Sequence, residues 1–262
     1  IKNHTDANVQ LHVELKEDHK KIPTIHWIPK IHKNPYKSRF IVNSISSSTK
    51  QVSVMLTSCL TSIKSHVQKY SNKVYENSGI NLFWSINNSL DVVECIEGRR
   101  FIVSTINTYD FSTLYTSIPQ HLLIKKLIPL IEKTFAREKT TYIAINDRKS
   151  FFTNEYLDKY TMWTCVDVCE ALKFVLDNSF LKFGKQLYKQ TIGIPMGANY
   201  APLIADLFLY CYESEYMLRI SKSGNNALVE HFNNSFRYID DILSMDNPLF
   251  TKEMSSIYPS EL

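Results

Sequence analysis

Two adjacent aspartates, Asp240 and Asp241, lie inside a run of strand-forming residues, and this feature constrains the fold more than any other. The surrounding residues, 236–244, are mostly apolar and predict a strand, a polar break and a second strand. Asp110 lies in a second run of β-branched and aromatic residues, 101–111, which predicts a buried strand. A carboxylate that loses its water is costly unless it is paired or bound to a metal. Three carboxylates in such positions therefore need a reason.

A divalent cation is one such reason. If the two strands are neighbours in one sheet, the apex of the hairpin brings Asp240 beside Asp110. The two carboxylates could then hold two Mg²⁺ ions for in-line phosphoryl transfer. The alternative is turn chemistry, because Asp-Asp is common in turns and Asp110 can cap the next element. The residues alone leave both interpretations open.

The rest of the 262-residue chain predicts alternating helices and strands in one or two domains. Apolar residues recur at helical spacing over 51–70 and 166–178. Residues 180–190 predict a hairpin that turns at Gly184, and the composition of residues 193–197 predicts a loop.

Two further helices complete the pattern. Ser117 can cap the first, and Pro119 fits its first turn, where a missing N–H is harmless. Pro129 should kink or end this helix. Beyond Pro202, two adjacent apolar stripes predict a helix that is buried on a broad face. The order of the elements indicates an α+β fold.

The positive charge of the chain is concentrated in one segment. The net charge is only +4, yet residues 19–75 contain no Asp or Glu and carry ten lysines and arginines. Trp27 and Tyr36 lie among these cations, a mixture of point charges and stacking faces that suits phosphates and bases. The alternative is a solvated basic face without a ligand.

The remaining composition narrows the class of protein. Five cysteines are a low and odd count for a chain of this length, so a disulfide framework is not expected. The count indicates buried or idle thiols and a reducing compartment. No run of about 18 uncharged apolar residues is present, so no membrane span is expected. The chain begins at Ile1, which predicts a piece of a longer protein.

Four segments, in the order expected, resemble motifs of reverse transcriptases. Residues 238–241 (Tyr-Ile-Asp-Asp) match the Tyr-x-Asp-Asp signature, and residues 109–115 are similar to the first aspartate motif. Residues 190–202 resemble the Gly-containing motif between them. Upstream, residues 28–33 and 38–44 are similar to the fingers region of Penelope-like elements, the retroelement group closest to telomerase.

The resemblance covers the chain from residue 22 to the end, where residues 257–262 fit the tract after the catalytic hairpin. It implies a right-hand polymerase without its thumb. Residues 1–100 would form a basic, fingers-like region that binds nucleotide and template. Residues 101–262 would form the palm, an antiparallel sheet with packed helices. Because a palm is compact, part of the polar stretch 136–165 is expected to be an insertion.

The resemblance also implies a role for each carboxylate. Asp110 and Asp240 would hold both metal ions, Mg²⁺ with Mn²⁺ as a substitute, and the Phe111 carbonyl would be a further ligand. One metal would activate the primer 3′-hydroxyl, and the other would neutralise the leaving pyrophosphate. Asp241 would contribute mainly to the electric field and fix the turn.

Five other residues are expected to contact the nucleotide. Lys30 and Arg39 lie in the acid-free segment, where they can meet the triphosphate, and Lys33 is equally placed; Arg39 suits a bidentate contact. Tyr115 would block a 2′-hydroxyl and so select deoxynucleotides. The alternative for Tyr115 is a core aromatic at the start of a helix.

Met196 and Gly197 would line the nucleotide and template side, where Gly197 allows close approach of the backbone. The alternative for Met196 is core packing. The sequence departs from the Penelope-like pattern here, because Ala198 and Ala201 stand where serines are common. This departure affects the hydrogen bonding expected with the template.

Together these features predict an RNA-directed DNA polymerase of a retrotransposable element. Its partners would be an RNA template, a DNA primer and deoxynucleoside triphosphates, without a membrane. It would act inside the cell, in the nucleus rather than the cytoplasm. The alternatives are a telomerase-like cellular reverse transcriptase and a catalytically silent relic that binds nucleic acid.

Overall fold

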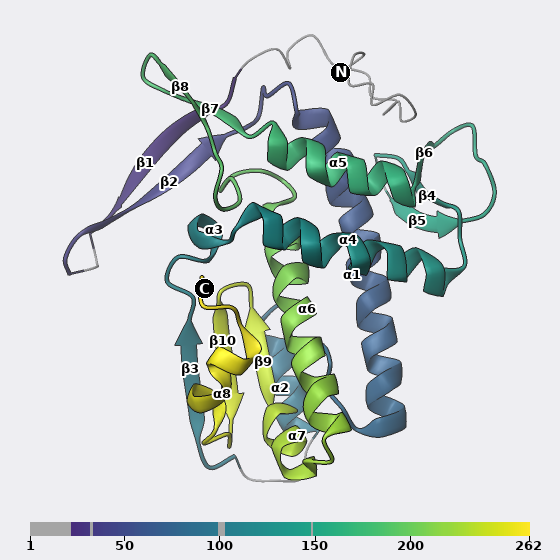
Figure 1. The fold of residues 1–262 in the computed structure, drawn as a ribbon, viewed down its shortest axis with the longest axis vertical. Coiled ribbons are helices and arrows are strands. Elements are labelled where there is room, and N and C mark those ends of the chain that lie inside the picture. Colours follow the sequence, from purple (N-terminus) through teal and green to yellow (C-terminus); the bar gives the residue numbers. More distant parts are fainter. Residues whose placement is uncertain (1–21, 32–33, 99–102, 148) are drawn as a thin grey trace. The chain divides into compact units, whose positions relative to one another are not determined.

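The computed structural model describes residues 22–31, 34–98, 103–147 and 149–262 (Figure 1). Its helices and strands are, in chain order, β1 (Thr24–Lys30), β2 (Lys37–Asn43), α1 (Lys50–Ser78), α2 (Ser89–Glu97), β3 (Ile106–Asp110), α3 (Leu114–Ser117), α4 (Gln120–Glu138), β4 (Tyr142–Ile145), β5 (Ser150–Thr153), β6 (Thr161–Thr164), α5 (Cys165–Asp177), β7 (Phe180–Phe183), β8 (Gln186–Lys189), α6 (Ala201–Lys222), α7 (Asn226–Phe232), β9 (Ser235–Tyr238), β10 (Asp241–Met245) and α8 (Phe250–Ile257). The predicted α+β fold is confirmed.

The chain forms two compact units that alternate along the sequence. Among the described residues, unit 1 contains those up to Lys64 and Tyr115–Ile204, and unit 2 contains Ser65–Leu114 and Ala205–Leu262. The single boundary predicted near residue 100 falls inside unit 2. The division into fingers and palm stays a prediction about function.

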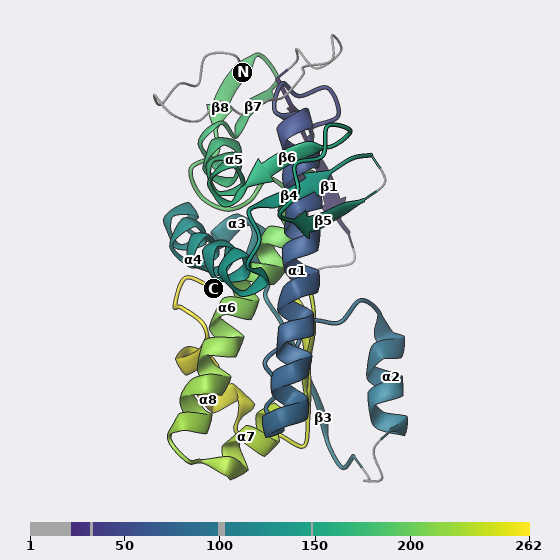
Figure 2. The ribbon, with the colours of Figure 1, turned by 90° about the vertical axis from the view of Figure 1, so that its right-hand side faces the viewer.

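Unit 1 is built on two sheets. The first has the order β2-β1-β7-β8, in which β1 pairs antiparallel with β2 and parallel with β7. The second is an antiparallel sheet of order β5-β4-β6 (Figure 2). Its Ser150 hydroxyl donates a hydrogen bond to the Ser58 carbonyl of α1 (2.8 Å). The buried apolar residues of α1, α4 and α5 include Val52, Leu56, Leu60, Leu123, Leu127, Ile131, Val168, Leu172 and Val175.

The second sheet lies in the stretch 136–165, where an insertion was predicted. Its three strands have only four residues each. Runs this short are too brief for a period-2 signal to be distinguished, so the sequence did not predict them. Whether the sheet is an insertion remains a prediction.

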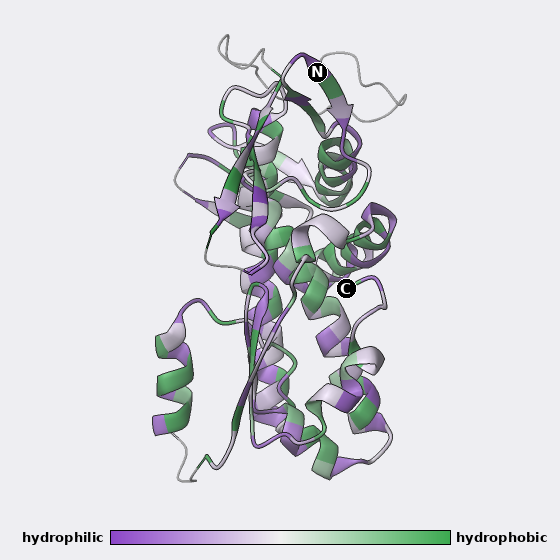
Figure 3. Ribbon diagram, turned by 90° about the vertical axis from the view of Figure 1, so that its left-hand side faces the viewer, coloured by the Kyte–Doolittle hydropathy of each residue, from purple (hydrophilic) through white to green (hydrophobic). Residues whose placement is uncertain are grey.

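Unit 2 is built on an antiparallel sheet of order β3-β10-β9. An aromatic cluster fills its core: Trp84 stacks on Phe232 with ring centroids 5.9 Å apart, and Phe250 stacks on Tyr109 at 4.6 Å. Helix α2 contributes no buried residue and stands apart in Figure 2. Figure 3 shows hydrophobic and hydrophilic residues mixed along it.

Most of the predicted elements are confirmed, including both hairpins and the helix beyond Pro202, which is α6. Helix α1 extends beyond the predicted range 51–70, to Ser78. The hairpin at 180–190 turns at Gly184, whose φ is +59°.

The start of α4 differs from the prediction. Ser117 ends the short helix α3, and Pro119 is the N-cap of α4 rather than part of its first turn. Pro129 does not end α4, which continues to Glu138. The turns after Pro129 bury Ile131 and Phe135, and this packing holds the helix together across the missing hydrogen bond.

The buried strand predicted over 101–111 is also wrong. Strand β3 comprises only Ile106–Asp110, lies at the edge of its sheet and is largely exposed, while residues 101–102 lie outside the described part. Composition favours a strand but does not distinguish an edge from a centre.

Two simpler expectations can be compared with the structure. The five cysteines form no disulfide with one another, as predicted. Among the described helices, none is long and apolar enough to cross a membrane.

Candidate active site

Three predicted carboxylates meet at one end of the sheet of unit 2. Asp241, the first residue of β10, is the register partner of Asp110 on β3 and of Tyr238 on β9. Asp240 lies in the two-residue turn between β9 and β10, and its carbonyl accepts a hydrogen bond from the Phe111 N–H (3.1 Å). The structure therefore brings Asp110, Phe111, Asp240 and Asp241 together, although 130 positions separate the first carboxylate from the second.

The three carboxylates repel one another. Burial raises the pKa of Asp241, and the negative charges of Asp240 and Asp110 raise this pKa further. None of the described basic side chains forms an ion pair with the cluster. A cation at this position would relieve the repulsion.

The donor set fits a hard divalent cation. In the part of the chain that the structure describes, no group of three or more His, Cys, Asp or Glu side chains could hold a metal ion. The predicted site needs fewer, because Mg²⁺ is usually bound by one or two carboxylates together with substrate phosphates and water. Asp110, Asp240 and the Phe111 carbonyl supply oxygen ligands of this kind. Asp110 and Asp241 are both exposed, so the loss of water expected from the sequence is at most partial at these two carboxylates.

The β1–β2 hairpin of unit 1 holds the predicted triphosphate ligands. Ile28 is the register partner of Arg39, and Lys30 is the partner of Lys37. Because cross-strand partners share a face and every second residue of a strand returns to it, Lys30, Lys37 and Arg39 lie on one face. Lys33 lies outside the described residues.

The opposite face of this hairpin is aromatic. Trp27 and Phe40 are register partners, and 57% and 47% of their surfaces are exposed. The sequence predicted a mixture of cations and stacking faces. The register separates them, with cations on one face of the hairpin and aromatic rings on the other.

The loop predicted over 193–197 packs directly against β2. The Val42 N–H donates to the Met196 carbonyl (2.6 Å), and the Ser44 hydroxyl donates to the Gly197 carbonyl (2.8 Å). Gly197 has a φ of +109°, and a Cβ there would overlap the Val42 carbonyl oxygen. Met196 and Gly197 are thereby fixed beside the strand that carries Arg39.

Tyr115 joins the same arrangement through its backbone. Its carbonyl accepts a hydrogen bond from the Ile194 N–H (2.7 Å), and a Cβ on Gly193 would overlap this carbonyl oxygen. The five predicted nucleotide-binding residues are therefore connected through β2 and one loop, all within unit 1: Lys30, Arg39, Tyr115, Met196 and Gly197. Their roles stay predictions.

Sequence reasoning missed a buried polar network behind the carboxylates. Arg237 is fully buried and contacts Asp206, Glu213 and the Ile239 carbonyl, and Tyr258 contacts Glu213. A signal was present. Asp206 and Glu213 are seven residues apart, on one face of an otherwise apolar helix.

The fold is similar to that of part of two solved telomerases. Telomerase from Candida albicans, in complex with a TWJ fragment of telomeric RNA, matches with a TM-score of 0.57 and 14% sequence identity. This match covers 94% of the present chain and 42% of that protein. Telomerase from Candida tropicalis, in the same type of complex, matches with a TM-score of 0.54 and 14% identity, over 89% of the present chain and 37% of that protein.

The chain thus spans less than half the length of these two proteins. No model of a protein family and no curated protein matches it. At this level of identity the comparison shows the fold alone, so the Penelope-like assignment stays a prediction.

Proposed function

We propose that the chain is the fingers and palm part of an RNA-directed DNA polymerase of Penelope-like type. The observation that supports this most directly is the meeting of Asp110, Asp240 and Asp241 at the end of one sheet in a telomerase-related fold. Unit 2 carries this palm-like sheet, and the cationic hairpin of unit 1 corresponds to the fingers.

In this proposal Asp110, Asp240 and the Phe111 carbonyl hold the divalent ions. When bound, Mg²⁺, or Mn²⁺ in its place, would supply Lewis-acid activation of the primer 3′-hydroxyl and charge neutralisation at the leaving pyrophosphate. Asp241 adds negative potential beside these ligands, which strengthens the attraction of cations to the site.

The residues of unit 1 bind and select the nucleotide. Arg39 and Lys30 contact the triphosphate, because a guanidinium and an ammonium on one face suit an anion with several oxygens. Met196 and Gly197 position the base pair, and Tyr115 excludes a ribose 2′-hydroxyl. The incoming nucleotide is therefore a deoxynucleotide.

The template in this proposal is RNA, and the primer is DNA. The acid-free segment supplies the positive potential that a phosphate backbone requires. The similar telomerases were solved with RNA, which supports an RNA partner here. The same comparison favours a second candidate, a telomerase-like cellular reverse transcriptase.

Primer extension tests the proposal. The purified protein is given poly(rA)/oligo(dT), Mg²⁺ or Mn²⁺, and either dTTP or UTP, and wild type is compared with Asp240→Asn. The control is Asp158→Asn, which makes the same change at an exposed position in unit 1. We expect dTTP incorporation that Asp240→Asn abolishes and Asp158→Asn retains.

Other outcomes would contradict the proposal in different ways. Equal extension by wild type and Asp240→Asn would refute the metal site. Incorporation of UTP would indicate an RNA polymerase. A folded protein that binds nucleic acid but incorporates neither nucleotide would support the silent relic.

A further inference from the structure

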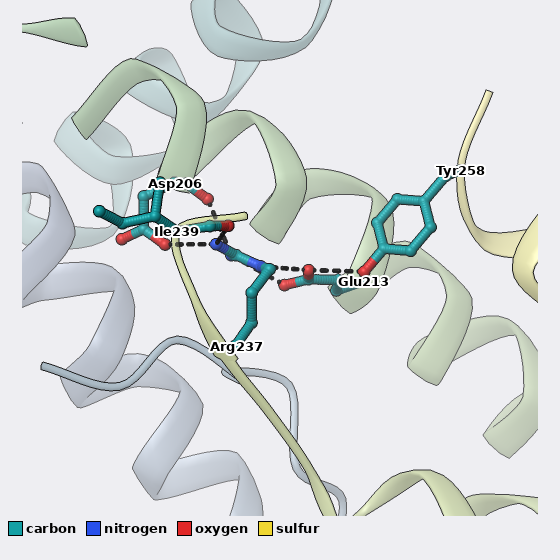
Figure 4. A network of polar contacts seen from close by, with 5 residues as sticks. All are labelled: Asp206, Glu213, Arg237, Ile239 and Tyr258. Atoms are coloured by element: carbon teal, nitrogen blue, oxygen red, sulfur yellow. Dashed lines mark hydrogen bonds and ion pairs between the residues drawn. The ribbon is translucent and has the colours of Figure 1, made fainter. Parts of the chain in front are cut away.

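The buried guanidinium of Arg237 contacts Ile239, the turn residue that immediately precedes Asp240 (Figure 4). Its Nε and Nη2 donate to the two carboxylate oxygens of Glu213 (2.5 and 3.1 Å). Nη1 donates to Asp206 Oδ1 (2.8 Å) and to the Ile239 carbonyl (3.2 Å), while Nη2 also donates to the Asp206 carbonyl (3.1 Å). All five N–H groups of the guanidinium are thus used.

An ion cluster of this kind carries a large desolvation cost in a protein core. Burial opposes the charge on Arg237, and the carboxylates of Glu213 and Asp206 raise its pKa above the ordinary value. Buried ion pairs are often no more stabilising than apolar residues of similar volume, so stability alone does not account for the cluster. The contact of Arg237 with the turn residue Ile239 indicates that the cluster fixes the conformation of this turn.

The turn has an unfavourable backbone conformation. Ile239 has a φ of +54°, a region that β-branched residues rarely occupy. The Ile239 carbonyl is the one that Arg237 Nη1 contacts. The guanidinium therefore holds the peptide that immediately precedes Asp240, at the residue whose backbone conformation is unfavourable.

Tyr258 extends the same support to the other carboxylate-bearing strand. Its hydroxyl donates to Glu213 Oε1 (2.8 Å), and its ring packs edge-on against Phe111 with centroids 4.9 Å apart. The Phe111 N–H in turn donates to the Asp240 carbonyl. The buried network of Arg237, Glu213 and Tyr258 thus contacts both the residue that follows Asp110 and the residue that precedes Asp240.

We propose that Arg237 and Tyr258 are positioning residues that hold Asp110 and Asp240 at the spacing required for the divalent ions. The inference rests on the proposed function. Neither residue touches the ions or the substrate. Both act through Glu213, Ile239 and Phe111.

Tyr258→Phe is the sharpest test, because it removes one hydroxyl and keeps the ring against Phe111. The matched control is Tyr216→Phe, which removes a buried hydroxyl of the same unit that donates to Glu253 (3.2 Å), away from the turn. Arg237→Lys is a second variant; it keeps the charge but supplies three donors without the planar fork.

The test compares five quantities between the variants: kcat and KM for dTTP, the Mg²⁺ concentration for half-maximal extension, the Mn²⁺ affinity by electron paramagnetic resonance, and the melting temperature. Loss of a residue that orients a metal ligand costs roughly 10- to 100-fold in metal affinity or activity. Tyr258→Phe should therefore lower kcat and weaken both metal responses by about tenfold, with KM unchanged. Tyr216→Phe should leave kcat, KM and both metal responses unchanged, even if its melting temperature falls as much as that of Tyr258→Phe.

Equal metal responses in Tyr258→Phe and Tyr216→Phe would overturn the inference, whatever their melting temperatures. If the wild type does not extend a primer, the proposed function fails, and Mn²⁺ affinity still decides the inference. Weaker Mn²⁺ binding in Tyr258→Phe then supports it. Unchanged binding, or no binding by the wild type, overturns it.

Discussion

Replacement of Gly197 by alanine should detach the loop 193–197 from strand β2. The φ of +109° strains any L-residue at this position, and the added Cβ would overlap the Val42 carbonyl oxygen, a backbone atom that cannot rotate away. The loop can accept the methyl group only by moving. Movement breaks the hydrogen bonds from Val42 to Met196 and from Ser44 to Gly197.

The cost has two parts. Each of the two hydrogen bonds contributes about 1 kcal/mol net. The left-handed backbone costs an alanine roughly 1–2 kcal/mol. Gly197→Ala should therefore lower the free energy of unfolding by about 3 kcal/mol. Gly184→Ala is the matched control, since Gly184 also has a positive φ, +59°, but has no atom within 4 Å of its Cβ position.

Urea unfolding, followed through tryptophan fluorescence in chains whose Trp84 is replaced by Phe so that only Trp27 and Trp163 of unit 1 report, measures both variants. Gly184→Ala should show the backbone strain alone, about 1 kcal/mol. A difference of about 2 kcal/mol between the variants would support the contact with β2. Equal losses would refute the reasoning, because the two glycines would then differ in nothing that matters to stability.

Two further predictions concern the site itself. The pKa of Asp241 is raised by burial, Asp240 and Asp110, so the folded chain holds this proton to higher pH than the unfolded chain does, and ionisation lowers stability as pH rises. Without divalent ions, Asp241→Asn should therefore raise the urea midpoint at pH 7 but not at pH 3; a gain of equal size at both would contradict the repulsion. Tyr115→Ala should increase incorporation of UTP relative to dTTP at least tenfold in primer extension, whereas unchanged selectivity would leave Tyr115 a packing residue.

Local patterns predicted most of the hairpin that carries Asp240 and Asp241. Apolar residues on both sides of Asp240 and Asp241 specify two strands joined by a tight turn, although the turn is Ile239–Asp240 and Asp241 already begins β10. The pairing of β10 with β3 could be stated only as a condition, because nothing local in residues 106–110 records which strand they pair with.

The exposure of β3 could not be predicted from the sequence, for a related reason. Its residues have the composition of a buried strand, and its exposure follows from its place at the sheet edge, which is a property of the whole sheet. The same holds for α4, where Pro129 breaks one hydrogen bond but long-range packing of Ile131 and Phe135 preserves the helix.

The network around Arg237 shows a different limit. An arginine in a strand is ordinarily assigned to the surface, and only the acidic pair Asp206 and Glu213, seven residues apart on α6, suggests a buried partner. Connecting the two requires knowing that α6 covers the face of β9 on which Arg237 lies. That knowledge comes from the fold.

The alternation of the two units along the chain limits how this protein can be divided. Each unit contains two separate stretches of sequence, with boundaries inside α1, α3 and α6. No single cut releases either unit whole and by itself. A single crossover between two related genes likewise cannot exchange one whole unit and leave the other unchanged, so the two units are not interchangeable modules.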